Sequence, residues 1–497
     1  MRRIDHALGK QRFGYCKKYP HDILLEKLKE LIKIMSLHIV ILAAGQGKRM
    51  HSATSKVLHK LGGKPMLVRV VETAMHLNPA AIHVIIGHGG EQIKETLPTL
   101  PVNWVLQEQQ LGTGHAVMQA LPHIPADSNV LILSADVPLI QSDTLRALID
   151  QSQPKYNQSA PLALLLASVA DPSGLGRIVR NPQDQITAII EEKDANTEQR
   201  AIKEIYSGIC CTTAANLNRW LPKLGHQNAQ GEYYLTEIIA MAVAEHLSIV
   251  SVQATDSMEI LGVNNRFQLQ QLERIWQMRL AVQLLHAGVT LADASRIDVR
   301  GELQCGTDVF IDVNTVFSGQ VNIGDGCVIG PNCVLTNVTL GSNCHIFANS
   351  VLEDCSMDND CHIGPFARIR PGTKLAEKCK IGNFVEAKNA VFSAGTKANH
   401  LSYLGDVTVG SHVNIGAGTI TCNYDGVNKH HTNIEDGVNI GSDTQLVAPV
   451  TIGKNATIGA GSTIRKNAPP GELTLTVSTQ KTVYGWVRPI KKDPAND

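Results

Sequence analysis

This chain of 497 residues has few aromatic residues, no net charge and no long apolar run. Phe, Trp and Tyr make up only 4% of it, whereas glycine reaches 41 residues, and both values favour a coiled β-structure with small interior side chains. Lys and Arg number 45, as do Asp and Glu, so neither a basic field for nucleic acid nor a polybasic membrane anchor is expected. No apolar run reaches the roughly 18 residues of a membrane span, and the length predicts two to four domains.

Cysteine occurs eleven times, but the closely spaced pairs of a zinc site are missing, as is any segment that looks like a secretory signal. Disulfides or a metal site would be the alternatives to small buried side chains. We expect reduced thiols and a cytoplasmic protein, because that compartment keeps cysteines reduced.

The first 34 residues differ in character from the rest of the chain. The stretch RRIDHALGKQRFGYCKKY is basic and patternless, and LLEKLKELIKI has the spacing of an amphipathic helix. Neither has the apolar core of a signal peptide. We expect residues 1–34 to be an extension, irregular or helical, upstream of a start at Met35.

From about residue 300 an aliphatic residue recurs every six positions, as in VNIGDGCVIGPNCVLTNVTLGSNCHIFANS (321–350). A fixed six-residue period predicts a parallel β-helix. Units begin at Cys305, Ile311, Phe317, Ile323, Ile329, Leu335, Leu340, Ile346, Leu352, Met357, Ile363, Ile369, Leu375, Ile381 and Ala387, then at Tyr403, Val409 and Ile415, and again from Ile434 to Ile464.

The fifth position of every unit is Val, Thr, Cys, Ser or Ala. In a narrow three-sided coil, we expect the first position to fill the interior and the fifth to point inward where only a small side chain fits. The short units at Leu335 and Leu352 are interpreted as losing only their sixth residue, which turns Thr339 and Ser356 inward. Residues one turn apart should stack at strand spacing. This places a ladder of buried thiols on one face: Cys327, Cys344, Cys361 and Cys379.

Two interruptions of the period are predicted to leave the coil as loops. They are SAGTKANHLS (393–402), which contains His400, and TCNYDGVNKHHTN (421–433), which contains Asn423 and Tyr424. Loops on a rigid scaffold often carry function, so these two segments are candidate sites.

The first half alternates apolar strands with helical stretches. Ile39–Leu42 is predicted to be a buried strand that leads into a Gly-rich turn, where the backbone can approach phosphates beside Lys48, Arg49 and Lys56. A second predicted strand, in VLILSADVPL (130–139), ends at Asp136. The carboxyl ends of strands bind ligands in open α/β sheets, and a carboxylate there suits Mg²⁺. A helix cap or loop carboxylate is the alternative for Asp136.

Several motifs of the first half together resemble the sugar nucleotidyltransferases: LAAGQGKRM, QLGTGHA, SADVPL, GLGRIVR (174–180), IIEEKDA (189–195) and GVNNR (262–266). Joined to the hexapeptide array, they resemble the family that combines N-acetylglucosamine-1-phosphate uridyltransferase with glucosamine-1-phosphate acetyltransferase. The second half matches in GPFARIRPG (364–372), IGNFVEAKNA (381–390), NHLSYLGD (399–406), VNIGAGTITCNYDG (413–426) and GSDTQLVAPV (441–450).

The resemblance implies an α/β Rossmann-like nucleotidyltransferase domain followed by a left-handed parallel β-helix. We expect the first domain at 35–265, a connecting helix and linker at 266–298, the β-helix at 299–470 and a tail at 471–497. Residues 266–288 have helical spacing, which would equally fit one more helix of the first domain.

For the uridyltransferase site the resemblance implies Mg²⁺ at Asp136 and Asn264, triphosphate handling by Arg49 and Lys56, and sugar contacts at Gly176 and Glu191. Further contacts to UTP and the sugar are implied for Leu42, Ala43, Ala44, Gly45, Gln107, Gly112, Thr113, Ser134 and Ala135. Tyr206 stands where the family has Asn, which removes that amide from sugar binding.

For the acetyltransferase site the resemblance implies His400 as the base that frees the 2-amine of glucosamine-1-phosphate, which then attacks acetyl-CoA. Arg370 and Lys388 are implied to bind the sugar phosphate. Tyr403, Asn414, Asn423 and Tyr424 would orient sugar and acetyl group, and Ala417, Ser442 and Ala460 would line the CoA side. Val477 stands where the family has an Arg in its tail. The family also implies a homotrimer with composite acetyl sites.

The implied product is UDP-N-acetylglucosamine for cell-wall peptidoglycan and lipopolysaccharide precursors. One alternative is a nucleotidyltransferase for another sugar whose β-helix serves assembly alone, but His400 and Asn423 argue against it. A non-catalytic scaffold on the same folds is the other, and Lys56, Asp136 and Asn264 argue against it.

Overall fold

The computed structural model describes residues 36–154 and 159–489. The predicted extension at 1–34 and the last residues of the predicted tail lie outside this part of the chain. The chain forms two compact units. Of the described residues, one unit comprises those up to Gln46 with Val70–Ala135 and Ile140–Ile260, and the other comprises Gly47–Arg69, Asp136–Leu139 and 261–489.

The first unit is built on a mixed sheet with the strand order β11-β7-β10-β6-β1-β4-β5. Its strands are β1 (Leu37–Leu42), β4 (Ala81–Ile86), β5 (Asn103–Leu106), β6 (Asn129–Ser134), β7 (Leu162–Ser168), β10 (Glu204–Thr213) and β11 (Ile249–Gln253). The neighbours β5, β4, β1 and β6 pair in parallel, whereas β10 pairs antiparallel with β6 and β7. The parallel strands are near-continuous apolar runs because both of their faces are buried. The predicted Rossmann-like sheet is confirmed.

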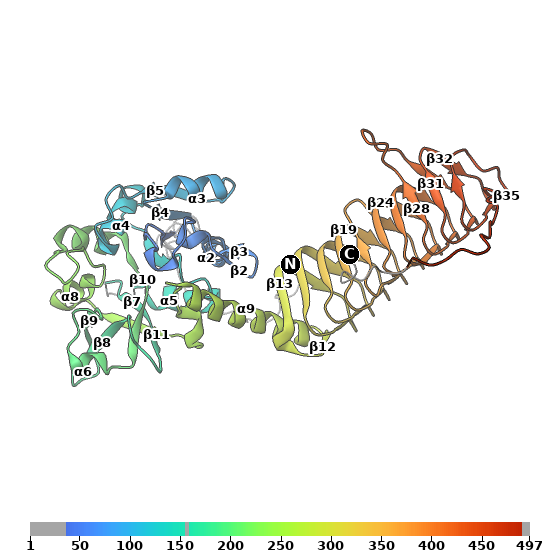
Figure 1. Ribbon diagram of the computed structural model, residues 1–497. Helices are drawn as coiled ribbons and strands as arrows, with labels where there is room; N and C mark the ends of the chain where they lie inside the picture. The colour runs from blue at the N-terminus through green and yellow to red at the C-terminus, as the bar shows by residue number, and fades with distance from the viewer. Residues whose placement is uncertain (1–35, 155–158, 490–497) are drawn as a thin grey trace, which may run out of the picture. The chain divides into compact units, whose positions relative to one another are not determined.

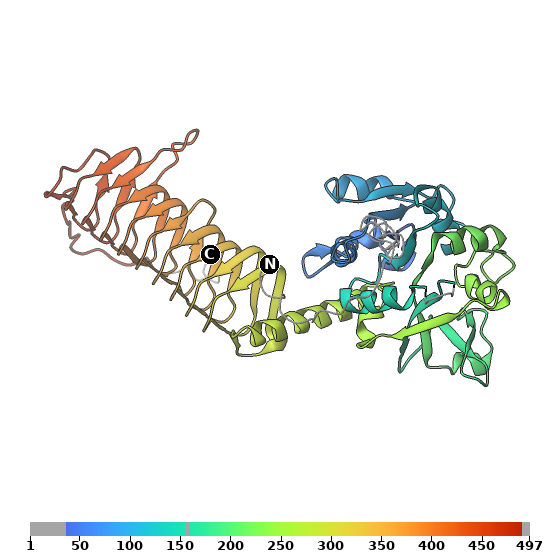
Figure 2. The same ribbon diagram turned by 180° about the vertical axis from the view of Figure 1, so that it is seen from behind.

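Helices and a small antiparallel hairpin complete this unit (Figures 1 and 2). The hairpin joins β8 (Gly176–Arg180) and β9 (Ile186–Ile190). The helices are α3 (Gly90–Thr96), α4 (Thr113–Ala120), α5 (Ser142–Gln151), α6 (Thr197–Arg200), α7 (Ala214–Trp220) and α8 (Glu237–Ala244), and α2 (Met66–Met75) begins in the other unit's segment. Because α4 follows β5 directly, its first residues lie near the carboxyl edge of the sheet.

The last segment of the second unit, which starts at Leu261, contains the predicted connecting helix, α9 (Arg266–His286). The side chain of Asn265 caps its first turn by accepting a hydrogen bond from the Gln268 N–H. The buried amide of Gln277 bonds at 2.8 Å to both the N–H and the carbonyl of Val299. The helix is thereby fixed to the first long strand of the coil, β13 (Ile297–Cys305).

The predicted parallel β-helix follows α9, and its turns stack along the axis of the coil (Figures 1 and 2). Its strands form an 11-stranded and a 13-stranded parallel sheet. In the first sheet one interior row runs through Ile311, Ile329, Ile346, Ile363, Ile381, Ala398, Ile415, Ile440 and Ile458. Each of these residues is at least 97% buried, as expected for the left-handed β-helix of hexapeptide repeats.

The short units differ from the prediction in which residue points inward. Val338 and Cys355 are buried, whereas Thr339 is exposed and Ser356 is half-buried. Each short unit lies in a strand that continues into the next unit, β17 (Val334–Leu340) or β19 (Val351–Met357). Side chains alternate along a strand, so the inward residue must lie two positions before the next aliphatic. The missing residue is therefore lost from the corner and not from the end of the unit.

The prediction that 393–402 leaves the coil is wrong. Phe392, Ala398 and Leu404 are buried and fill the interior at six-residue spacing. The strand β25 (Lys397–His400) pairs with β23 (Lys380–Asn383) and β27 (Asn414–Ile415). The period seemed to break because Ala387 opens a third five-residue unit and because Ala398 is smaller than the aliphatic expected there. Leu404, and not Tyr403, fills the interior, so Tyr403 lies on the outer face.

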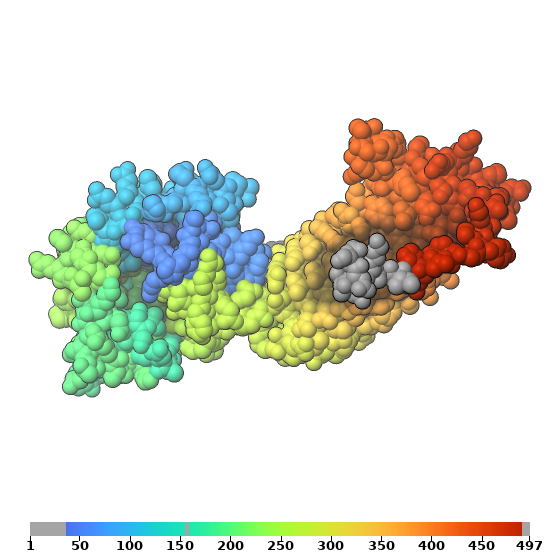
Figure 3. Space-filling view, in the orientation of Figure 1, coloured from blue at the N-terminus to red at the C-terminus, as the bar shows by residue number. Residues whose placement is uncertain are grey.

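The second predicted loop is confirmed. Thr421 is the last interior residue before it, in β28 (Ile420–Cys422), and the coil resumes at β29 (Thr432–Ile434). Between them the chain folds back on itself through an antiparallel bridge from Tyr424 to Lys429. The segment stands clear of the coil beside β28 and forms a knob on its surface (Figures 1 and 3).

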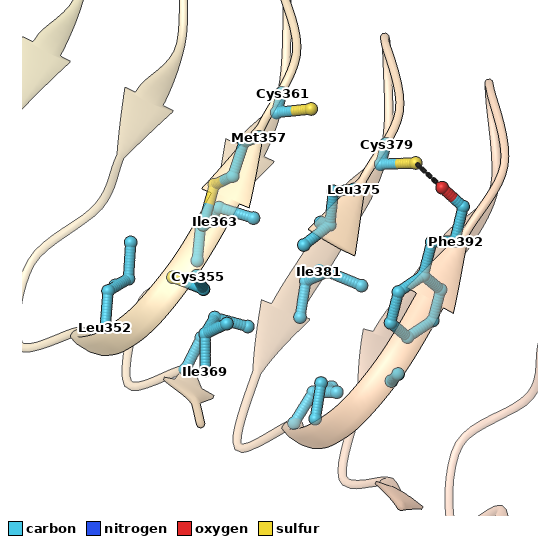
Figure 4. Close-up of a cluster of buried hydrophobic side chains, with 14 of the residues drawn as sticks. Leu352, Cys355, Met357, Cys361, Ile363, Ile369, Leu375, Cys379, Ile381 and Phe392 are labelled. Atoms are coloured by element: carbon cyan, nitrogen blue, oxygen red, sulfur yellow. Dashed lines mark hydrogen bonds between the residues drawn. The ribbon is translucent and has the colours of Figure 1, made fainter. Parts of the chain in front are cut away.

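The predicted ladder of thiols is also confirmed. The four cysteines have no exposed surface and carry free thiols. Cys361 and Cys379 lie beside the aliphatic side chains of the core in Figure 4. Each thiol donates to a backbone carbonyl of the next turn, from Gly341 to Ser393, at 3.0 to 3.2 Å.

Candidate active sites

The Gly-rich turn after β1 lies at the carboxyl edge of the first unit's sheet. Leu42 pairs with Ser134 at the end of β6, and the Ala135 N–H donates to the Leu42 carbonyl at 3.0 Å. Ala43 and Ala44 are buried, whereas Gly45 is exposed. Six of the predicted contact residues are thus brought to one edge: Leu42, Ala43, Ala44, Gly45, Ser134 and Ala135.

Gln107 follows β5 at the same edge and is almost fully buried. Its side-chain nitrogen contacts the Gly112 carbonyl at 3.2 Å and the Nδ1 of His115 at 3.0 Å. A side chain on Gly112 would lie 2.7 Å from the backbone of Tyr233, at a φ of +113°. The Thr113 hydroxyl accepts a bond from the Leu235 N–H at 3.0 Å. The sequence analysis did not identify His115 as functional, although it lies in the motif QLGTGHA.

Glu191 and Gly176 come together through the hairpin. A side chain on Gly176 would meet Ile189 at 2.9 Å and Glu191 at 3.8 Å. Burial raises the pKa of Glu191, while a 3.2 Å bond from the Thr236 hydroxyl opposes this shift. Tyr206 pairs with Gly176 across β10 and β8, and its buried ring packs in the core.

Lys56, Asp136 and Asn264 form a compact group in the second unit. The Lys56 ammonium is bonded to the Asp136 carboxylate and lies 3.4 Å from the Asn264 Oδ1. The Val263 N–H donates to the Asp136 carbonyl at 2.9 Å, which places Asn264 beside it. Lys56 in turn packs against Gly47, where a Cβ would lie 2.8 Å from its own. Arg49 is exposed in a short 3-10 turn, Lys48–Met50.

This group fits a magnesium site, because oxygens of Asp136 and Asn264 already converge on one cation, the Lys56 ammonium. Within residues 36–154 and 159–489 no cluster of three His, Cys, Asp or Glu side chains could hold a metal by itself. Mg²⁺ commonly binds through one or two protein oxygens plus substrate phosphates, so the two oxygens are sufficient.

Positive charge gathers on the outer face of the coil. Lys429, in the loop after Asn423, lies beside Lys388, and the neighbouring ammonium lowers the pKa of Lys429. Arg370 is paired with Glu386 at 2.7 Å, and Glu386 is in register with Tyr403 on β26 (Tyr403–Val409). Arg370, Lys388 and Tyr403 therefore lie on adjoining turns. Sequence analysis missed Lys429, because only the fold-back of the loop brings it to Lys388.

His400 lies at the end of β25 with an exposed side chain. Its Nδ1 is 2.9 Å from the Oδ1 of Asn383. Asn414 pairs with Lys397 on the neighbouring strand, and its amide donates to Asn439 at 2.9 Å. No motif in the sequence identified Asn383 as the partner of His400, because the two residues are 17 positions apart.

Asn423 and Tyr424 differ in exposure. Asn423 is only 8% exposed and its amide donates to Asp406, whereas Tyr424 is 60% exposed and donates to the Gly426 carbonyl at 2.6 Å. Of the predicted pair, Tyr424 has its ring free to approach a ligand, whereas Asn423 has little exposed surface and is held by Asp406.

The three residues predicted to line the CoA site, Ala417, Ser442 and Ala460, lie in a row on successive turns of the coil. The Asp443 N–H donates to the Ala417 carbonyl at 2.7 Å, and the Gly461 N–H donates to the Ser442 carbonyl at 2.8 Å. A side chain on Gly441 would lie 2.5 Å from the Ala460 nitrogen. The row has small side chains over closely packed backbone. Val477 is 88% exposed in the tail.

Comparison with known proteins gives matches in both halves of the chain. A family model described as the MobA-like NTP transferase domain matches residues 39–167. Another, described as bacterial transferase hexapeptide (six repeats), matches 304–337 and 431–466. The chain is 68% identical over 459 residues to the bifunctional protein GlmU of Legionella pneumophila, covering 92% of this chain and 100% of that one. It is 53% identical over 455 residues to that of Marinobacter nauticus, covering 92% and 99%. The chain therefore belongs to the family of bifunctional GlmU proteins, enzymes with both acetyltransferase and uridyltransferase activity.

Proposed function

We propose that the two reactions of this enzyme use separate sets of residues. The coil, 299–470, acetylates glucosamine-1-phosphate with acetyl-CoA, and the domain at 35–265 transfers UMP from UTP to the resulting N-acetylglucosamine-1-phosphate. Asn264, close to the helix and linker at 266–298, belongs to the residues of the uridyltransferase reaction. The observation that carries this division is that His400 contacts Asn383 within the coil, whereas the side chains of Asp136 and Asn264 converge on Lys56 outside it.

Uridyl transfer joins two anions, so charge must be neutralised while the phosphate attacks the α-phosphorus of UTP and pyrophosphate leaves. Lys56 and Arg49 supply positive charge for the triphosphate. Asp136 and Asn264 would hold Mg²⁺, which adds positive charge at the phosphates. The turn Leu42–Gly45, Gln107 and the Gly112–Thr113 step bind the nucleotide.

The sugar of the second substrate is assigned to Gly176 and Glu191. Tyr206 takes no part, because its ring is buried in the core. A glycine at position 176 lets the sugar approach Glu191 without a side chain between them.

Acetyl transfer needs a neutral amine, because an ammonium has no lone pair. His400 removes one proton from the 2-ammonium of the sugar. The amine then attacks the thioester carbonyl and a C–N bond forms. The C–S bond breaks as the nitrogen's surplus proton passes to the leaving sulfur, and CoA leaves as the free thiol. Arg370, Lys388 and Lys429 bind the sugar phosphate, Tyr403, Asn414 and Tyr424 position the sugar and acetyl group, and Ala417, Ser442 and Ala460 accept CoA.

A homotrimer is supported by an apolar row on the coil. Phe366, Phe384 and Leu401 are 50%, 55% and 62% exposed and have positive φ angles, from 42° to 57°. The two phenyl rings stack with centroids 5.4 Å apart. Bulky apolar residues rarely adopt such φ angles, and an exposed apolar row of this kind marks a protein contact. Phe384 and Leu401 directly follow Asn383 and His400, so a second copy covering this row would lie next to the base and complete the acetyl site.

The cytoplasm is the proposed location. Ten cysteines of the described chain carry free thiols, which suits a reducing compartment. Within the same residues, no helix is long and apolar enough to cross a membrane. The product, UDP-N-acetylglucosamine, would supply peptidoglycan and lipopolysaccharide precursors.

The decisive experiment assays both half-reactions in His400→Ala and Asp136→Ala. The first change should abolish acetyl transfer and leave uridyl transfer unchanged, and the second should do the reverse. Loss of both activities in either variant would contradict two separate sites. Sedimentation of Phe384→Asp tests the trimer, because a charge in the apolar row should shift the mass toward the monomer and reduce acetyl transfer alone. An active wild-type monomer would exclude the trimer.

A further inference from the structure

One corner of the coil carries a row of residues in the left-handed backbone region. Gly319, Asn337, Asp354, Gly372, Asn389 and Asp406 have φ between 44° and 81°. Asn and Asp tolerate this conformation better than other residues with side chains. Their side chains bond from turn to turn: Asn337 donates to Asp354 at 2.8 Å, and Asn389 donates to Asp406 at 2.7 Å. The last residue of this row, Asp406, bonds to Asn423, where the loop begins.

Asp406 differs from Asp354 in burial and in the number of partners. Asp406 is only 7% exposed, and its two oxygens accept bonds from the amides of Asn389 and Asn423. Asp354 is exposed, and the one side-chain hydrogen bond that its carboxylate accepts from the described residues comes from Asn337. A buried carboxylate is costly unless hydrogen bonds and nearby cations stabilise it. Around Asp406 these are the two amides and the cations of Lys388 and Lys429.

Asn423 links this carboxylate to the loop. Its side chain is held by Asp406, and its carbonyl accepts a bond from the His430 N–H at 2.8 Å, which closes the base of the loop. The residues between them include Tyr424 and Lys429, which pair across the loop. Any shift of Asn423 therefore moves both of these residues relative to Lys388.

We propose that Asp406 is a positioning residue for acetyl transfer, holding Asn423 and through it the loop 423–431 against the coil. This rests on the proposed acetyltransferase role of the coil. One carboxylate oxygen accepts from the amide of Asn423 and orients it. The other accepts from Asn389, which belongs to the preceding turn of the coil. It also lies close to both Lys388 and Lys429, so that two cations can remain side by side for the sugar phosphate.

The test uses the full chain with Asp406→Asn, and with Asp354→Asn as the matched control on the same row. The carboxamide has one acceptor oxygen where the carboxylate has two, so it cannot accept from both Asn389 and Asn423, and the anchored pair is broken while the size is kept. Misplacing binding groups by about 1 Å can reduce a rate up to about 100-fold. We expect kcat/KM for glucosamine-1-phosphate to fall at least about tenfold. The KM for acetyl-CoA and the rate of uridyl transfer should stay near wild type, and Asp354→Asn should leave both of these and kcat/KM for glucosamine-1-phosphate unchanged.

A double-mutant cycle distinguishes positioning from a general structural effect. If Asp406 acts through Asn423, the double variant Asp406→Asn, Asn423→Ala should be no less active than the worse single variant. Multiplying losses, wild-type acetyl transfer in Asp406→Asn, or an equal loss in Asp354→Asn would each overturn the proposal. If Asp406→Asn does not fold, Asn423→Ala remains a test, since unchanged acetyl transfer in that variant also overturns it. Wild-type protein without acetyl transfer would instead overturn the proposed function.

Discussion

The Nδ1 of His400 lies 2.9 Å from the Oδ1 of Asn383, one turn away in the coil. An amide oxygen can only accept a hydrogen bond, so Nδ1 carries the proton of the neutral ring. Nε2 then keeps its lone pair. Asn383 thereby selects the tautomer in which His400 can take a proton from the substrate ammonium.

Replacing Asn383 by Ala should lower kcat of acetyl transfer, because the ring loses both its fixed orientation and its preferred tautomer. General base catalysis contributes about 100- to 10,000-fold, and we expect a loss of about 10- to 100-fold from this change. Steady-state assays of both reactions measure it. Asn383→Asp retains the acceptor and should keep most of the activity, with uridyl transfer unchanged in both variants. Wild-type kcat in Asn383→Ala would show that His400 needs no orienting partner.

The second prediction concerns the choice of nucleotide. The Gln107 side-chain nitrogen is bonded to Gly112 and His115, which leaves the carboxamide oxygen to accept the N3–H of uracil. Cytosine has no hydrogen at N3. We expect His115→Ala to loosen this amide and to reduce the preference for UTP over CTP by about tenfold, which corresponds to about 1.4 kcal/mol. The ratio of kcat/KM values measures it.

The matched control is His226→Ala, because His226 contacts the ring of Tyr233 and has no bond to Gln107 among the described residues. An unchanged UTP preference in His115→Ala, or an equal loss in His226→Ala, would contradict a role of His115 in holding Gln107.

The sequence predicted the coil and its interior because the constraint repeats. Each turn requires an aliphatic side chain and a small one at fixed positions. An irregular residue in one unit therefore does not hide the period that the other units share. Where a unit lost a residue, the count alone could not show which residue was missing. The pleat of the strand, which places Val338 and not Thr339 inward, is a local geometric fact that only the structure supplies.

The parts of the candidate sites that escaped prediction are side chains one turn apart. Asn383 lies 17 residues before His400, and Asp406 lies 17 before Asn423. That separation has meaning only when the length of every turn is known, and the length varies: 18 residues separate His362 from its partner Lys380, and 17 separate Lys380 from Lys397. The position of Lys429 beside Lys388 depends on how the loop folds back. The loop has no sequence repeat from which that fold could be predicted.

The third prediction concerns the inward positions of the coil. Cys361 lies in a place that admits only a small side chain, so Cys361→Leu should overpack the interior and lower the free energy of unfolding by about 1–3 kcal/mol. Cys361→Ala is the control, and should cost less because it adds no volume. Urea unfolding measures both. Equal stability of the Leu and Ala variants would mean that the interior has room to spare.

Thiol labelling provides an independent check of the same interior. Burial raises the pKa of Cys355 to about 12, and this lowers the fraction of reactive thiolate. Cys355 and the four thiols of the ladder should label only as fast as the coil opens. Among the cysteines of the described residues, Cys422, which is half-buried beside the loop, should label before the ladder. Rapid labelling of the ladder in folded protein would contradict a closed core.

The last prediction is a loss of stability in acid, caused by a buried histidine in the first unit. His83 lies on β4 between the rings of His38 and His123, with His38 Nδ1 at 3.2 Å from its Nε2. Burial, together with the two neighbouring imidazoles, lowers the pKa of His83 to about 4. An unfolded chain takes up a proton near pH 6.5, where the folded chain does not, so the unfolded state binds more protons between pH 6.5 and 4. Stability should therefore fall as the pH falls through that range.

His83→Leu removes the titrating group, and its urea midpoint should depend less on pH between 6.5 and 4 than that of the wild type. His286→Leu is the control, because His286 is exposed at the end of α9 and should leave the pH dependence unchanged. The slope of unfolding free energy against pH measures the difference in bound protons directly. A wild-type slope in His83→Leu would assign the acid sensitivity to other groups, with His38 the next to replace, since burial lowers its pKa as well.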